Sequence, residues 1–227
     1  MSITLYTLCG ADRARPFSPH CWKIVMALAH KGLVFEERPL PFTGIPLVED
    51  GASRTVPLLR DGDQLIADSF AIAVYLDEVY SDRPSLFKGE GGVALARFVE
   101  GYSQTVLHTA ATKIAVKMIH DMLDPADQVY FRQSREARLG STLEDLTAGR
   151  DEEIASFPAK LEPLRHMLRY QPFLGGETPL FADYIVLGLF QWLRITTGST
   201  YLSADDPASL WLDRCLDLFE GRARQVA

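Results

Sequence analysis

The chain has 227 residues, of which 47% are hydrophobic and 23% are charged, an ordinary composition for a globular protein of one large or two small domains. Its formal net charge is −7 and it contains no basic run, so nucleic acid and anionic membranes are poor partners. Three cysteines do not make a disulfide framework, which favours a reducing, cytoplasmic location. The N-terminus lacks the pattern of a secretory signal, and the most apolar window, Tyr184 to Leu193, is far shorter than the ~20 residues that span a bilayer.

The first third of the chain predicts alternating strands and helices. Residues 2–8 are β-branched and apolar and predict a buried strand. Apolar residues from Trp22 to Ala29 then recur at helical spacing, with Gly32 where a C-terminal cap belongs. Residues 33–40 predict a second strand.

A hairpin and a helix are expected next. Two short apolar runs, residues 55–60 and 64–67, flank Asp61-Gly62-Asp63, which is a strong hairpin signal. A helix is predicted from Ser69 to about Tyr80.

The remainder of the chain carries helical patterns only. Proline, glycine and charged residues between 81 and 92 predict a linker. Helices are expected over residues 93–123, 126–139, 152–170, 181–197 and 209–222. The patterns therefore predict an α/β domain over residues 1–82, a linker over 83–92 and an all-helical domain over 93–227.

The stretch Ser18-Pro19-His20-Cys21 has the form of a thiol–disulfide redox motif whose first cysteine is replaced by serine. Ser18 and Pro19 have an ordinary interpretation as the N-cap and first residue of a helix. The functional interpretation is that the Ser18 hydroxyl and the helix N-terminus stabilise the thiolate of a bound small molecule. Cys21 cannot close the short-range disulfide and is expected to pack in the core.

Two further pairs of residues have the same double interpretation. Pro57, which leads a strand, is either an ordinary edge proline or a cis proline that lets Val56 pair with an extended peptide. Asp68-Ser69, at a helix start, is either a cap or a site for a zwitterion, with the ammonium at Asp68 and the carboxylate at Ser69. Each pair alone is weak evidence, whereas their order and spacing together are much stronger.

In combination, Ser18-Pro19, Val56-Pro57 and Asp68-Ser69 resemble the motifs of the glutathione transferase family, and the resemblance extends over nearly the whole chain. It implies a thioredoxin-like N-terminal domain followed by an all-helical domain that builds most of the second-substrate site. It also implies glutathione as co-substrate and a homodimer.

The resemblance assigns roles to individual residues. Ser18 would activate the glutathione thiol and Val56, held by Pro57, would pair with the cysteinyl backbone. Asp68 and Ser69 would hold the γ-glutamyl group, and Arg54 or Thr55 would reach the glycine carboxylate.

A finer resemblance is to the bacterial β-etherase branch of the family, whose members use glutathione to break β-aryl ethers in lignin-derived compounds. It depends on short stretches that include Phe42-Thr43-Gly44-Ile45, Phe181-Ala182-Asp183-Tyr184 and Trp211-Leu212-Asp213-Arg214. The resemblance implies a small hydrophobic, aromatic electrophile, although no motif identifies the substrate residues of the helical half. One departure is the position three residues before Asp183, where the family often has a capping Ser or Thr and this chain has Leu180.

Two alternative functions remain open: a glutathione-dependent thiol reductase that uses Cys21 or Cys9, and a non-catalytic binding protein with the same fold. Tyr6 is expected to pack rather than to activate a thiol. The five histidines show no metal-ligand spacing, so no metal site is expected. Tyr102 and His108 lie where the family places second-substrate contacts, but they are also ordinary helix residues.

Overall fold

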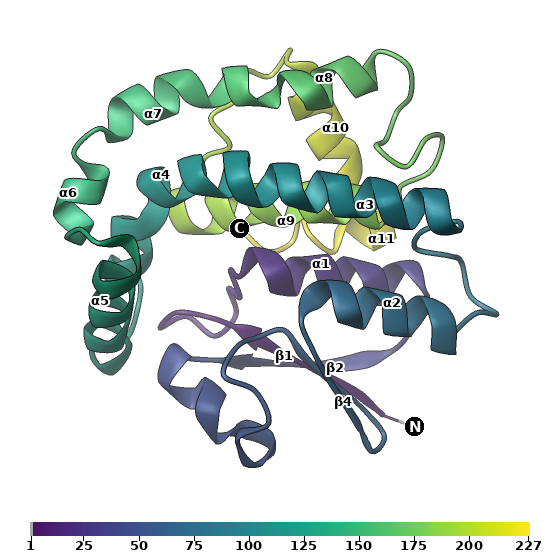
Figure 1. Ribbon diagram of the computed structural model, residues 1–227, viewed down its shortest axis with the longest axis horizontal. Helices are drawn as coiled ribbons and strands as arrows, with labels where there is room; N and C mark the ends of the chain where they lie inside the picture. Colours follow the sequence, from purple (N-terminus) through teal and green to yellow (C-terminus); the bar gives the residue numbers. More distant parts are fainter. Residues whose placement is uncertain (1) are drawn as a thin grey trace.

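The computed structural model describes residues 2–227. A four-stranded sheet forms the base of the first part, in the order β2 (Phe35–Leu40), β1 (Ile3–Leu8), β3 (Leu58–Asp61), β4 (Gln64–Ala67). β1 and β2 run parallel, and the other neighbours are antiparallel. Helices α1 (Pro19–His30) and α2 (Ser69–Val79) lie between the sheet and the helical part of the chain (Figure 1). This arrangement confirms the predicted thioredoxin-like domain.

The central strand is buried because neighbours cover both of its edges and both of its faces. All six residues of β1 are buried, and its register pairs Ile3 with Phe35 and Tyr6 with Leu58. The 3₁₀ segment η1 (Phe42–Gly51) occupies the irregular stretch between β2 and β3. Glu49, in this segment, accepts a hydrogen bond from the Tyr6 hydroxyl at 2.6 Å and forms an ion pair with Arg60, so the segment is held against the sheet.

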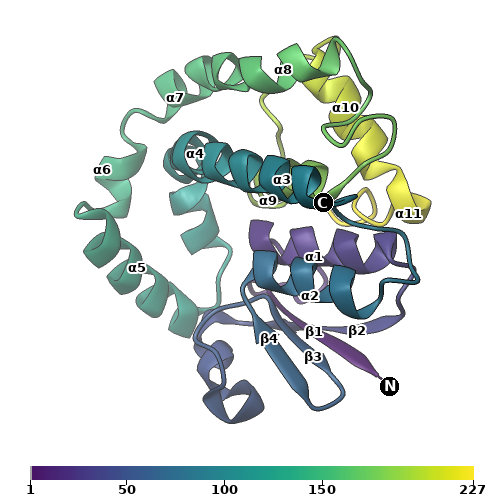
Figure 2. The ribbon, with the colours of Figure 1, turned by 45° about the vertical axis from the view of Figure 1, so that its right-hand side comes forward.

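The second part is all-helical, as predicted. In both ribbon views α5 to α8 curve around the outside of α3, α4 and α9 (Figure 2). The helices are α3 (Glu90–Tyr102), η2 (Ser103–Leu107), α4 (His108–Asp121), α5 (Pro125–Leu139), α6 (Leu143–Thr147), α7 (Arg150–Ser156), η3 (Phe157–Leu161), α8 (Glu162–Leu168), α9 (Phe181–Thr197), α10 (Pro207–Leu216) and α11 (Leu218–Gly221). Within residues 2–227, no helix is both long enough and apolar enough to cross a bilayer.

The two parts pack closely where α1 meets α9. A Cβ atom added to Gly188 of α9 would lie 2.3 Å from the carbonyl oxygen of Pro19, so only glycine permits this approach. Since Pro19 is the first residue of α1, the contact fixes the start of that helix, and therefore Ser18, against the helical part.

The structure corrects the single helix predicted over residues 93–123. The helix begins earlier, at Glu90, inside the stretch predicted as a linker. Gly92 belongs to this helix because it packs closely: a Cβ atom there would lie 1.6 Å from the carbonyl oxygen of Phe87, so the position requires glycine for space and not for flexibility. It is then interrupted by the π-helical turn η2, which separates α3 from α4.

Two other predicted helices are also divided. Residues 152–170 form α7, η3 and α8, because Pro158 and Pro163 each stand near the start of a new segment. Residues 209–222 are divided between α10 and α11, with Phe219 and Glu220 in the left-handed region. In contrast, α9 has the predicted bounds.

Asp183 connects the first turn of α9 to its surroundings. Its fully buried carboxylate accepts hydrogen bonds from the backbone N–H groups of Leu174 (2.7 Å), Gly175 (2.9 Å) and Leu180 (3.0 Å). The indole N–H of Trp211 donates a fourth, at 2.9 Å. Asp183 therefore satisfies backbone donors even though Leu180 occupies the cap position.

Candidate functional site

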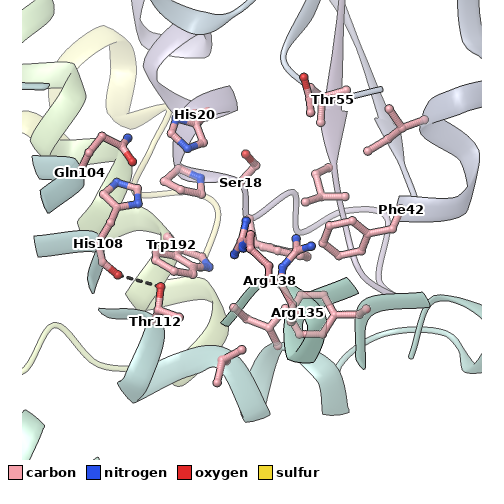
Figure 3. Close-up of a pocket in the computed structure, with 18 of the residues that line it drawn as sticks. Ser18, His20, Phe42, Thr55, Gln104, His108, Thr112, Arg135, Arg138 and Trp192 are labelled. Carbon is pink, nitrogen blue, oxygen red and sulfur yellow. Dashed lines mark hydrogen bonds between the residues drawn. The ribbon is translucent and has the colours of Figure 1, made fainter. Parts of the chain in front are cut away.

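A cavity of about 710 Å³ lies between the two parts of the chain (Figure 3). All six site residues predicted from the sequence line it: Ser18, Arg54, Val56, Pro57, Asp68 and Ser69. The helical part contributes a second set of lining residues, which includes Gln104, His108, Thr109, Thr112, Lys113, Tyr130, Phe131, Arg135, Arg138, Leu139 and Trp192. The N-termini of α1 and α2 therefore open into one space with a mixed aromatic and cationic far wall.

Ser18 is the N-cap of α1 and is buried. Its Oγ accepts a hydrogen bond from the backbone N–H of Cys21 at 3.4 Å, which is long for such a bond. Within residues 2–227, the neighbouring group that can accept from the hydroxyl is the Cys21 thiol, a weak acceptor, and this contact lowers the pKa of the thiol against the larger effect of burial. The hydroxyl can turn instead to a charged acceptor in the cavity, where the positive end of the helix also favours negative charge.

Asp68 caps α2 with only one of its two carboxylate oxygens. Oδ1 accepts from the N–H groups of Phe70 and Ala71, each at 2.9 Å. Oδ2 has no partner within the described part of the chain, and Ser69 beside it is buried. Asp68 has a φ of 73°, an unusual conformation for a non-glycine residue, and this conformation occurs where the chain passes from β4 into α2 at the cavity. One carboxylate oxygen thus remains for a cation.

Val56 offers unpaired backbone groups to the cavity. The Val56–Pro57 bond is cis, which is the second of the two alternatives that the sequence left open. Throughout residues 2–227, neither the N–H nor the carbonyl oxygen of Val56 has a hydrogen-bond partner. Next to it, the Ser53 hydroxyl donates to the carbonyl oxygen of Thr55 at 2.7 Å and stabilises the turn. This segment can pair with an extended peptide backbone.

Three rings stack along one wall of the cavity. The ring centroids of His20 and His108 are 5.4 Å apart, and those of His108 and Trp192 are 5.6 Å apart. Burial lowers the pKa of His20 to about 3, and burial lowers that of His108 well below its usual value, with neighbouring charges adding to both. Both imidazoles are therefore neutral near neutral pH, and the wall they form is aromatic rather than cationic.

A second aromatic group lies where η1 meets α5. The backbone N–H groups of Phe42 and Thr43 donate to the buried carboxylate of Asp127 in α5, at 2.6 and 2.9 Å. This contact holds the Phe42 ring 5.4 Å from that of Phe131 and 6.1 Å from that of Tyr130, measured between centroids. Phe42, Tyr130 and Phe131 thus form a cluster at the cavity that neither half could make alone.

The thiols do not contribute to the cavity lining. Cys21 is buried, as the core interpretation expected, and Cys9 is buried as well. Burial raises the pKa of Cys21 to about 12 and also raises that of Cys9. Thiols with these properties are poor nucleophiles at neutral pH, so the thiol reductase alternative has no support from the structure.

The two tyrosines considered from the sequence also lie outside the cavity lining. Tyr6 packs in the sheet and donates to Glu49, as expected. Tyr102 hydrogen-bonds to the carbonyl oxygen of Lys160. His108 does line the cavity, so of the two helical candidates only the histidine lies at the site.

Sequence reasoning missed His20, Phe42, Trp192 and the α5 arginines as lining residues. The spacing of Phe131, Arg135 and Arg138, at i, i+4 and i+7, places them on one face of a helix and was a usable signal. No such signal existed for Phe42 or Trp192, because their places depend on contacts between distant segments.

Comparisons with known proteins agree with this geometry. Residues 17–79 match the family model of the glutathione S-transferase N-terminal domain, and residues 94–217 match that of the C-terminal domain. The glutathione S-transferase-like protein ustS of Aspergillus flavus is 26% identical over 217 residues, which cover 82% of this chain and 76% of that protein.

Solved structures show the same fold. The glutathione transferase GSTFuA3 of Phanerochaete chrysosporium superposes with a TM-score of 0.76 at 26% identity, over 99% of this chain and 94% of that chain. The glutathione S-transferase CsGST83044 of Ceriporiopsis subvermispora, solved in complex with glutathione, gives a TM-score of 0.82 at 20% identity, over 97% and 98% of the two chains. With both domain models matched in order along the chain, this protein belongs to the glutathione S-transferase family.

Proposed function

We propose that the chain is a glutathione transferase in which Ser18 stabilises the thiolate of glutathione for attack on an aromatic electrophile. Glutathione is the co-substrate of the family to which the chain belongs. The observation that carries the proposal is that the N-termini of α1 and α2 open into one cavity with aromatic side chains opposite them. Such helix termini favour anions, and a preorganised hydroxyl donor favours a thiolate.

Each part of glutathione has a group that suits it. The free Oδ2 of Asp68 suits the γ-glutamyl ammonium, and the buried Ser69 at the start of α2 suits its carboxylate. The unpaired backbone of Val56 suits the cysteinyl residue. Arg54, which lines the cavity near Thr55, suits the glycine carboxylate.

The reaction is a nucleophilic displacement. The thiolate sulfur forms a bond to the electrophilic carbon, and the leaving group departs with the electron pair of the bond it breaks. In a β-aryl ether this carbon carries an aryloxide, which leaves as a phenolate and takes a proton from water. We propose ether cleavage on the basis of the short stretches similar to the β-etherase branch, and the Phe42 cluster supports an aromatic substrate.

The first test is the ultraviolet difference spectrum of glutathione thiolate on binding, recorded across pH. We expect the bound thiol to ionise below the ~8.5 of an ordinary thiol. Turnover of chlorodinitrobenzene and of a β-aryl ether model compound would then be measured. Binding of glutathione only as the thiol would contradict the role of Ser18, and binding without turnover of any electrophile would favour the non-catalytic alternative.

We also propose that the protein is a homodimer, as the family resemblance implies. The exposed apolar side chains Leu47 and Phe98, 80% and 74% accessible, are available for burial in such an interface. Sedimentation equilibrium should give twice the chain mass of 25.3 kDa. A mass equal to one chain at micromolar concentration would contradict this.

A further inference from the structure

Two arginines of α5 share the face of that helix that lines the cavity. Arg135 and Arg138 are three residues apart, so their side chains lie next to each other on the helix surface. Figure 3 shows both side chains extending into the cavity from the helical side.

Arg135 rests on the aromatic cluster. Its guanidinium carbon lies 4.7 Å from the ring centroid of Phe131 and 5.2 Å from that of Phe42. The group also donates to the Ser134 hydroxyl at 2.9 Å. Planar guanidinium groups stack well on aromatic faces, so Arg135 is oriented before any ligand arrives.

Neither arginine has an acidic partner. In the part of the chain that the structure describes, no carboxylate oxygen lies within 4.0 Å of either guanidinium, whereas Arg132 on the same helix pairs with Glu136 and Glu144 at 2.8 Å. Burial lowers the pKa of Arg135 to about 10, and the charge of Arg138 adds to this shift. A partly buried cation next to a like charge is unfavourable unless an anion joins it.

The lining of the cavity carries more positive than negative charge. Arg54, Lys113, Arg135 and Arg138 line it, against Asp68 as the acidic residue. Lys113 is paired with Glu153 at 3.2 Å. Arg54 and Asp68 belong to the first part of the chain, where glutathione is proposed to bind, which leaves the α5 pair for the second substrate.

We propose that Arg135 and Arg138 form a subsite for a carboxylate on the second substrate, whose aromatic ring lies against Phe42, Tyr130 and Phe131. The inference rests on the proposed glutathione-dependent function and names its substrate class: an aromatic electrophile that carries a carboxylate. A guanidinium offers two parallel donors that match the two oxygens of a carboxylate, and the second arginine balances the remaining charge.

The test compares two electrophiles that differ at one position, chlorodinitrobenzoate, which carries a carboxylate there, and chlorodinitrobenzamide, which carries a neutral amide of similar shape. For each, kcat/KM is divided by the rate constant of the uncatalysed reaction with glutathione. We expect this normalised kcat/KM of the wild-type protein to be roughly tenfold higher for the benzoate, which is the effect expected of a charge-assisted pair of hydrogen bonds. Arg138→Gln and Arg135→Gln should each abolish most of this preference, whereas Arg135→Lys, which keeps the charge but not the two parallel donors, should retain part of it.

Arg132→Gln is the matched control, since it removes an arginine from the same helix on a face paired with glutamates. It should leave the benzoate-to-benzamide ratio unchanged. The proposal is overturned if the wild-type protein shows no preference, or if the α5 variants raise the KM for glutathione while the ratio stays constant. The second result would assign the arginines to glutathione.

A binding arm separates this inference from the proposed function. Dinitrobenzoate and dinitrobenzamide lack the leaving group, and their binding can be followed by quenching of tryptophan fluorescence, since Trp192 lines the cavity. If no electrophile is turned over, the proposed function fails. The subsite still stands if dinitrobenzoate binds more tightly than the amide and Arg138→Gln removes the difference, and it falls if the two bind equally.

Discussion

Replacing Ser18 with alanine is expected to lower kcat/KM for glutathione conjugation by about 100-fold, the usual cost of removing one preorganised donor to a developing or bound anion. The hydroxyl is buried, and its neighbouring acceptor is the weakly accepting Cys21 thiol, so it can donate to the thiolate of glutathione instead. The pKa of the bound thiol should rise toward the ~8.5 of a free thiol, and the pH profile of kcat/KM should move upward with it. Steady-state kinetics and thiolate difference spectra across pH measure both effects.

The matched control is Ser85→Ala. Ser85 also accepts backbone hydrogen bonds, from Phe87 at 3.2 Å and Lys88 at 2.8 Å, and its hydroxyl donates to Asp77 at 2.9 Å, but it does not line the cavity. Both substitutions should reduce stability by about 1 kcal/mol through the lost cap or turn contact. If the two variants lose the same small amount of activity, Ser18 acts as a helix cap alone.

Replacing Asp183 with alanine is expected to lower the free energy of unfolding by about 3–5 kcal/mol, because it leaves several buried donors without an acceptor. Four N–H groups, including the indole of Trp211, converge on its fully buried carboxylate. Asp183→Asn keeps the shape but presents an amide N–H₂ to two of these donors, so it should also destabilise, though less than alanine. Urea unfolding followed by circular dichroism measures the differences.

Asp217→Ala serves as the control for Asp183→Ala. The Asp217 carboxylate is exposed and pairs with Arg224 at 2.5 Å, so its loss should change stability by at most about 1 kcal/mol. A similar small effect for both aspartates would mean that solvent reaches the Asp183 donors and that the buried network is not a major source of stability.

The elements of the α/β half could be predicted because they depend on local rules: helix starts follow capping residues and strands end at turn residues. The joint site at Ser18, Val56 and Asp68 was predicted from the resemblance to the glutathione transferase family, since each pair alone also has an ordinary interpretation as a cap or an edge proline. All three residues line one cavity. The bounds of α9 were predicted for the same reason, since its apolar pattern is long and uninterrupted.

The far wall of the cavity could not be predicted in this way. Phe42 is placed by its N–H bond to Asp127, 85 residues further along the chain, and no local pattern signals such a contact. The left-handed conformations of Glu49 and Asp50 likewise depend on contacts with the sheet, through Tyr6 and Arg60. We expect that wall to select the second substrate, so the sequence leaves the finer identity of the substrate open.

The π-helical turn η2 also changes how the helical half can vary. Such a turn holds one residue more than the α-helix it interrupts, and each residue of an α-helix advances the direction of the side chains by about 100°. The face of α4 that bears His108 and Thr112 therefore points in a different direction about the helix axis than it would if α3 continued as one uninterrupted α-helix. A single inserted or deleted codon in this turn would present a different row of α4 side chains to the second substrate while leaving the first half of the molecule unchanged. Relatives that differ in length by one residue here would then differ in substrate range.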